Sequence, residues 1–146
     1  MHRGAAWLAL IPFTGIGIVA RADEASDAKR HGPIAWMVSL EGAQKVAARE
    51  KKIVMVDFWA QWCGPCKAML ATTYKDKAVV AKTKSLVPVL IDLDKHKELA
   101  SKYSITAIPA LLFFNSKGKL IGRSMGYLDK DQLLKQIDDA GKKARS

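Results

Sequence analysis

The chain has 146 residues, of which 49% are apolar, and its formal net charge at pH 7 is +10. This length suits one domain and leaves too few residues for two ordinary ones, while the apolar content is enough to build a core. The chain has two cysteines, which argues against a small scaffold held together by several disulfides.

The first 22 residues have the layout of a secretory signal peptide. Arg3 gives a basic start, an apolar stretch follows over residues 5–20, and Ala20-Arg21-Ala22 has the small-x-small pattern of a cleavage site. The alternative is an uncleaved membrane anchor over residues 5–20, although this stretch is shorter than the roughly 20 apolar residues that span a bilayer. We therefore expect an exported protein, in the periplasm or another extracytoplasmic compartment.

The charge of the expected mature chain is strongly positive. Cleavage after Ala22 would leave 22 basic and 14 acidic residues, a net charge of about +8. Such a charge favours acidic partners or an anionic membrane surface. The lysines are spread over expected helix faces and turns, without aromatic residues among them, so the pattern predicts a solvated basic surface and no nucleic-acid partner.

The next part of the chain predicts a short lead-in, a helix and a buried strand. Residues 23–35 are polar and are expected to form a flexible lead-in to the domain. Apolar residues then recur at helical spacing up to Lys51, in a helix that Ser39 can cap. The run 53–60 is short and nearly all apolar, as in a strand buried on both faces of a parallel sheet. One charged residue, Asp57, interrupts it.

The middle of the chain predicts two short helices, a strand and a third helix. The turn 61–66 should open a helix that ends near Thr72, and a second helix is expected over 77–84 after a break at 74–76. The apolar run 86–93 predicts another strand. Asp94 is then expected to cap a helix that ends at Lys102.

The last third of the chain predicts a hairpin and a helix. Strands are expected over 110–114 and 119–124, joined by the turn Asn115-Ser116-Lys117-Gly118. Asp129 and Gln132 form a capping-box pattern at the start of the last helix, which we expect Gly141 to end. Residues 142–146 should form a loose basic tail. The order of elements predicts a single α/β domain over residues 36–141.

Four interpretations compete for the segment Cys63-Gly64-Pro65-Cys66. A structural zinc site needs about four ligands, and the two cysteines and three histidines are not spaced for one. Attachment of a c-type haem needs a histidine where Lys67 stands. A structural disulfide over so short a loop would remove little chain entropy. The favoured interpretation is a redox-active dithiol, with no metal and no cofactor other than the Cys63–Cys66 disulfide itself.

The position of the first cysteine supports this interpretation. Cys63 precedes a predicted helix, in which Pro65 suits the first turn. Unpaired N–H groups and the positive end of the helix dipole favour a thiolate there. The thiolate is the form that attacks a disulfide. Cys66 lies one turn further on, where it can resolve the mixed disulfide.

Residues 57–67, Asp-Phe-Trp-Ala-Gln-Trp-Cys-Gly-Pro-Cys-Lys, resemble the active-site segment of thioredoxins. Ile108-Pro109, followed by an apolar strand, is similar to the cis-proline element of that family, and Gly126 falls where the family has a glycine near the site. The resemblance covers roughly residues 36–140. It implies the thioredoxin fold, a central mixed β-sheet flanked by helices.

The resemblance also implies roles for residues of the active-site segment. Cys63 would be the attacking nucleophile and Cys66 the resolving thiol, with Gly64 and Pro65 shaping the loop between them. Asp57 would be a buried carboxyl with a raised pKa that accepts the proton of Cys66 during resolution.

A second group of residues is implied to bind the substrate. Trp62 would pack beside the dithiol and shield it. Pro109 would be cis, with Ala107 and Ile108 presenting backbone groups that pair with the substrate chain as a strand does. Gly126 completes this expected surface.

The sequence departs from the family in two places. Leu90 stands where thioredoxins commonly carry a lysine near the buried aspartate, which should raise the pKa of Asp57 further. Ala71 stands where many members have a proline that kinks the active-site helix. Residues 68–94, which include both of these positions, are instead similar to the C-terminal domain of the periplasmic disulfide-reductant transporter.

The residues between the cysteines indicate the direction of electron flow. Gly-Pro is typical of reducing thioredoxins, at about −270 mV, whereas the strong periplasmic oxidant lies at about −120 mV. We therefore expect a reductase of disulfide-containing proteins. The sequence has no flavin or nicotinamide motif, so electrons should come from a membrane or exported dithiol donor. The alternatives are a thiol oxidase or isomerase of the same fold, or a holdase module that binds unfolded clients. We expect a monomer.

Overall fold

The computed structural model describes residues 22–146. The predicted signal peptide therefore lies outside the described residues, apart from Ala22 at its end. Within the described part, no helix is both long enough and apolar enough to cross a membrane.

The centre of the fold is a four-stranded sheet in the order β2-β1-β3-β4. These strands are β1 (Ile53–Trp59), β2 (Leu86–Asp92), β3 (Ala110–Phe114) and β4 (Leu120–Met125). β1 pairs with β2 in parallel and with β3 antiparallel, and β3 pairs antiparallel with β4. The sheet is therefore mixed, as the resemblance implied.

Alternating side chains of β1 face two separate hydrophobic clusters. Met55 and Trp59 belong to one cluster, and Val54, Val56 and Phe58 belong to the other. Six of the seven residues of β1 are buried, as are all five residues of β3. A strand that is buried on both faces needs apolar residues throughout, which explains the nearly unbroken apolar run that the sequence shows here.

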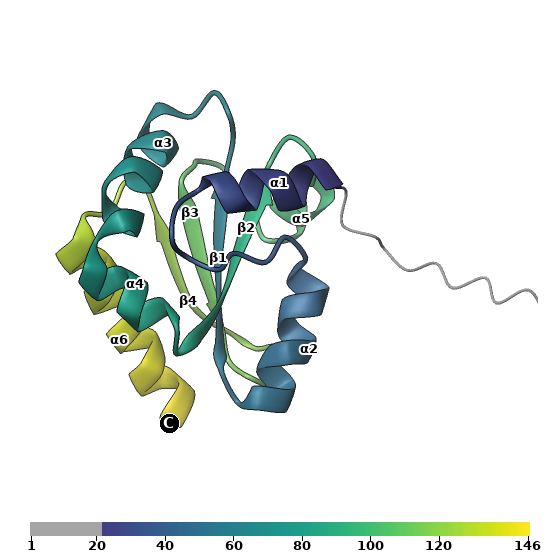
Figure 1. Cartoon of the computed structure of the whole chain (residues 1–146). Helices are drawn as coiled ribbons and strands as arrows, with labels where there is room; N and C mark the ends of the chain where they lie inside the picture. Colours follow the sequence, from purple (N-terminus) through teal and green to yellow (C-terminus); the bar gives the residue numbers. More distant parts are fainter. Residues whose placement is uncertain (1–21) are drawn as a thin grey trace, which may run out of the picture.

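Helices cover both faces of the sheet (Figure 1). Residues of α2 (Leu40–Glu50) contribute to the cluster on one face, where α5 (Lys97–Lys102) also lies. The opposite face carries α3 (Gly64–Ala71), the single turn η1 (Thr73–Lys75), α4 (Lys77–Thr83) and α6 (Lys130–Arg145). α2, α3, α4 and α5 lie within a few residues of their expected bounds, whereas η1 occupies residues where a break between helices was expected.

Residues 23–30, which we predicted to be part of a flexible lead-in, instead form most of the helix α1 (Ala22–Arg30). Ala28 is buried in the same cluster as the cysteines. Acidic side chains of α1 pair with the loop after β2, because Lys95 lies 3.0 Å from Asp23 and His96 Nε2 lies 2.9 Å from Glu24 Oε1. These long-range contacts, which sequence periodicity does not reveal, hold a short polar helix on the domain.

The C-terminal helix is also longer than predicted. α6 continues through Gly141 to Arg145, so the expected loose tail is helical. A glycine inside a helix costs only about 1 kcal/mol relative to alanine. Ala140 is still buried against the core, and Lys142, Lys143 and Arg145 lie at the end of the helix where the dipole favours positive charge.

Candidate active site

The two cysteines lie where the chain leaves the end of β1 and enters α3. Cys63 is the N-cap of α3, and its Sγ accepts a hydrogen bond of 3.2 Å from the backbone N–H of Cys66. The two residues form a disulfide, and both are buried. A sulfur at this position faces the unpaired N–H groups of the first helical turn, which stabilise negative charge on it. After reduction, Cys63 is therefore the sulfur placed to become a thiolate.

Asp57 is a buried carboxyl group on β1, with 1% of its surface exposed. Burial raises its pKa to about 7, against the opposing effect of a hydrogen bond from Tyr74. The Tyr74 hydroxyl donates to Asp57 Oδ2 over 2.8 Å, whereas Oδ1 has no partner among the described residues. On the neighbouring strand Leu90 pairs with Asp57, so an apolar residue occupies the place where we noted the absence of a lysine.

Tyr74 is a site residue that the sequence analysis missed. It lies in η1, and its side chain is fully buried with its ring 5.0 Å from that of Trp36 in an edge-on arrangement. The sequence shows only an aromatic residue within a polar break between two helices. That residue is oriented toward Asp57 by the fold, and it gives the carboxyl group a single hydrogen-bond donor in place of a cation.

The proline loop has the backbone geometry that the resemblance implied. The Ile108–Pro109 peptide bond is cis. Pro109 is buried, Ile108 is half-buried and Ala107 is exposed. Among residues 22–146, the backbone N–H groups of Ala107 and Ile108 have no hydrogen-bond partner. Donors of this kind can pair with an extended peptide.

Gly126 is tied directly to this loop. Its N–H donates to the carbonyl oxygen of Pro109 over 2.8 Å, and its φ of +97° lies in the region that favours glycine. The neighbours of Gly126, Met125 and Tyr127, are 48% and 46% exposed. They form an apolar rim that the sequence analysis did not include, because exposure at the end of an edge strand has no clear sequence signal.

Trp62 is exposed, with 66% of its surface accessible. Its indole N–H donates to Asp94 Oδ2 over 2.9 Å. Asp94 was expected to cap a helix, but that helix begins at Lys97 with His96 as its N-cap, so this expectation is wrong. Asp94 instead fixes the orientation of Trp62 beside the cysteine pair. Trp59, by contrast, is buried in the core.

The described residues offer no other cluster for redox or metal chemistry. Within residues 22–146, no group of three or more histidine, cysteine, aspartate or glutamate side chains is placed to hold a metal ion.

Comparison with known proteins agrees with this geometry. Residues 37–139 match the family model described as Thioredoxin. The chain is 44% identical over 89 residues to a thioredoxin of Buchnera aphidicola subsp. Baizongia pistaciae, covering 57% of this chain and 73% of the relative. It is 36% identical over 107 residues to a thioredoxin of Acidithiobacillus ferridurans, covering 69% of this chain and 91% of the relative.

The fold is also similar to that of a solved thioredoxin. The solution structure of a thioredoxin from Thermus thermophilus superposes with a TM-score of 0.69 at 23% identity, covering 76% of this chain and 89% of that chain. Helix α1 and the residues before Met37 lie outside the match to the family model. From Met37 to Asp139 the sequence match, the mixed sheet and the Cys63–Cys66 disulfide agree, and the chain belongs to the thioredoxin family as a thioredoxin-type protein-disulfide reductase.

Proposed function

We propose that this chain is an exported reductase in which Cys63 attacks the disulfides of protein substrates and Cys66 completes the reaction. The hydrogen bond from the Cys66 N–H to Cys63 Sγ carries the assignment of roles, because it marks Cys63 as the sulfur at the helix N-terminus. The Cys63 thiolate attacks one substrate sulfur, forms a mixed disulfide and releases the other sulfur as a thiolate. Two electrons for the reduction come from the dithiol.

Resolution of the mixed disulfide uses the second cysteine and the buried carboxyl group. Cys66 loses its proton to Asp57 and attacks Cys63 Sγ, which restores the Cys63–Cys66 disulfide and releases the substrate as a dithiol. A pKa of about 7 suits a group that must accept and return a proton near neutral pH. In this proposal Tyr74 is a positioning residue, because it acts on the carboxyl group and not on the sulfurs.

The substrate chain would lie across the surface formed by Trp62, the proline loop and Gly126. We infer that an extended segment of the substrate pairs with the free N–H groups of Ala107 and Ile108. Trp62, held by Asp94, and the exposed Met125 and Tyr127 would contact its side chains. A binding surface made mainly of backbone groups suits many different substrates.

Two assays test the assignment. The full chain should reduce insulin in the presence of dithiothreitol, and Cys63→Ser should abolish this activity. Cys66→Ala should accumulate mixed disulfides on Cys63. If Cys63→Ser reduced insulin as well as the unchanged chain, the assignment would be wrong. Equilibration with glutathione tests the direction, since a potential above about −170 mV would indicate an oxidase or isomerase.

Export is supported by the sequence of residues 1–22, which has the order of a signal peptide. An exported reductant works in an oxidising compartment and must be re-reduced, and we propose a membrane or exported dithiol protein as its electron donor. A fusion of residues 1–22 to alkaline phosphatase should be active outside the cytoplasm, and an inactive fusion would contradict export.

A further inference from the structure

A basic cavity lies at the end of the sheet opposite the cysteine pair. It is lined by Ile53 and Leu86, the first residues of β1 and β2, whereas Cys63 follows the last residue of β1. The seven residues of β1 separate the two ends by about 20 Å. The cavity has a volume of about 710 Å³, within the range of about 300–1,000 Å³ that small-molecule sites occupy.

The lining of the cavity is strongly basic. The described residues that line it include eight basic side chains and one acidic side chain, Asp138, a net charge of +7 compared with +10 for the whole chain. Most of these side chains are exposed to solvent, as the sequence predicted. The fold, however, gathers positions that are far apart in the sequence around one cavity, which the sequence alone did not indicate.

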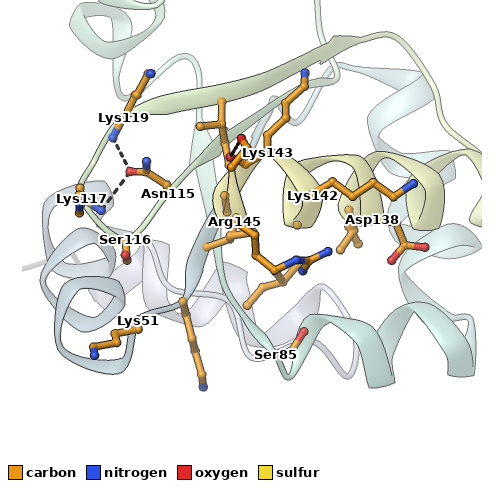
Figure 2. Close-up of a pocket in the computed structure, with 18 of the residues that line it drawn as sticks. Lys51, Ser85, Asn115, Ser116, Lys117, Lys119, Asp138, Lys142, Lys143 and Arg145 are labelled. Atoms are coloured by element: carbon orange, nitrogen blue, oxygen red, sulfur yellow. Dashed lines mark hydrogen bonds between the residues drawn. The ribbon is translucent and has the colours of Figure 1, made fainter.

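Four segments bring these side chains together, and Figure 2 shows most of them in close-up. The turn between β3 and β4 supplies Lys117 and Lys119, and the last turn of α6 supplies Lys142, Lys143 and Arg145. The residues that join α2 to β1 supply Lys51 and Lys52, and α4 supplies Lys82.

The backbone of two of these segments is fixed. Asn115 Oδ1 accepts hydrogen bonds from the N–H groups of Lys117 and Lys119, over 3.0 and 2.9 Å, as Figure 2 shows. Lys51 has a φ of +55° as the C-cap of α2, a position where glycine is the usual residue. A lysine is strained in this conformation, and its side chain lies in the cavity lining.

Most of these charges are not neutralised. Lys82 pairs with Asp138 over 2.6 Å and Lys52 pairs with Glu50 over 3.0 Å. Within residues 22–146, the other six basic side chains of the cavity have no carboxylate within salt-bridge distance. Like charges that share a concave surface repel one another, and a bound anion would remove that repulsion.

We propose that this cavity binds a small solute that carries two or more phosphate groups. Lysine and arginine make strong charge-assisted hydrogen bonds to phosphate oxygens. Asn115 uses its side-chain oxygen within the turn, which leaves its amide N–H groups free to donate. The hollow shape and limited volume favour a compact solute over a flat membrane, and the polar lining of Ser85, Asn115 and Ser116 favours hydrogen bonding to phosphate.

Calorimetric titration of the full chain with inorganic tripolyphosphate tests the proposal. We expect saturable binding that weakens as salt rises. The triple variant K117Q/K119Q/K143Q should weaken the affinity by about tenfold or more, which corresponds to ~1.4 kcal/mol. The matched control K29Q/K97Q/K130Q removes the same charge from exposed lysines outside the cavity. It should bind within about twofold of the unchanged chain, a difference of ~0.4 kcal/mol.

Three results would overturn the proposal. One is the absence of binding at about 1 mM tripolyphosphate, because a dissociation constant above that value would indicate a very weak ligand. Another is an equal loss of affinity in both triple variants, which would indicate bulk charge. The third is sedimentation with phosphatidylglycerol vesicles without binding of tripolyphosphate, which would indicate a membrane surface. Insulin reduction by both variants should equal that of the unchanged chain, so the test does not depend on the proposed redox function.

Discussion

At the scale of single residues, Asp57 combines a structural cost with a proposed catalytic role. Its pKa is raised from 3.8 to about 7 by burial, and its one hydrogen bond comes from Tyr74. Between these two pH values the unfolded chain carries an ionised Asp57, while the folded chain keeps it neutral. Folding therefore takes up a proton, and the free energy of unfolding should fall as pH rises through this window.

Replacement by asparagine isolates this effect. We compare the free energy of unfolding of the unchanged chain with that of Asp57→Asn. The difference, unchanged chain minus variant, should decrease by about 4 kcal/mol between pH ~3.5 and ~8. Urea unfolding of the oxidised proteins at both pH values measures it, and the constant cost of a buried amide cancels in the comparison. A difference independent of pH would show that Asp57 has an ordinary pKa in the folded protein.

Tyr74 should influence the pH dependence of resolution without touching the sulfurs. Because its hydroxyl donates to the Asp57 carboxylate, Tyr74→Phe should raise the pKa of Asp57 and move the pH profile of mixed-disulfide release upward. The loss of a buried hydrogen bond should also cost about 1–3 kcal/mol of stability. Tyr103→Phe, at a half-buried tyrosine of the opposite face, is the control and should leave the profile in place. An unchanged profile in Tyr74→Phe would remove Tyr74 from the mechanism.

Gly126 gives a test of the backbone at the site. A Cβ at Gly126 meets no atom within 4 Å, so the cost of Gly126→Ala comes only from its φ of +97°. We expect a loss of about 1–2 kcal/mol in the free energy of unfolding. Gly64→Ala is the matched control, because its Cβ also meets nothing within 4 Å and its φ lies outside the left-handed region. Equal stabilities of the two variants would show that the strain is absent.

At the scale of elements, helix α1 is the part of the structure that the family match does not cover. Ala28 of this helix is buried in the core. Asp23 pairs with Lys95, and Glu24 pairs with His96. Directly after the helix, the ring of His31 lies 4.3 Å from that of Trp59. A helix of nine residues has little stability of its own, so these contacts must supply it.

One charged side chain introduced on the buried face of α1 should detach this helix from the domain. Ala28→Asp would bury a carboxylate in the core cluster, and we expect amide-exchange protection of residues 22–30 to be lost. Ala25→Asp introduces the same side chain on the exposed face of the helix and should keep the protection. Protection in both variants would mean that the burial of Ala28 does not hold the helix.

Elements that depend on local pattern could be predicted from the sequence, and those that depend on distant contacts could not. The Asp129–Gln132 capping box is a local pattern and forms as expected. Gly141 has the sequence signature of a helix end, but packing of Ala140 and the basic last turn extend the helix past it. The lead-in became a helix because His96 and Lys95, more than 70 residues away, pair with it.

At the scale of the whole molecule, one end of the sheet could be predicted from local sequence patterns, whereas the other end depends on contacts between distant residues. The cysteine motif and the cis-proline element are each a short continuous segment of the sequence, so the redox site could be located before the structure was known. The contacts of Tyr74 with Asp57 and of Trp62 with Asp94 join residues that are 17 and 32 positions apart. They could therefore be identified only once the fold was known. The basic cavity joins segments from residue 51 to residue 146 and has no local signature at all.

The proposed chemistry depends on Cys63 becoming a reactive thiolate because it caps α3. The direct measurement is the rate of alkylation by iodoacetamide as a function of pH in Cys66→Ala, where Cys63 is the remaining thiol. Near pH 6.5 Cys63 should react about tenfold faster than a free cysteine in an unstructured peptide, because helix N-termini stabilise the thiolate. A rate equal to that of the peptide thiol across the pH range would contradict the account.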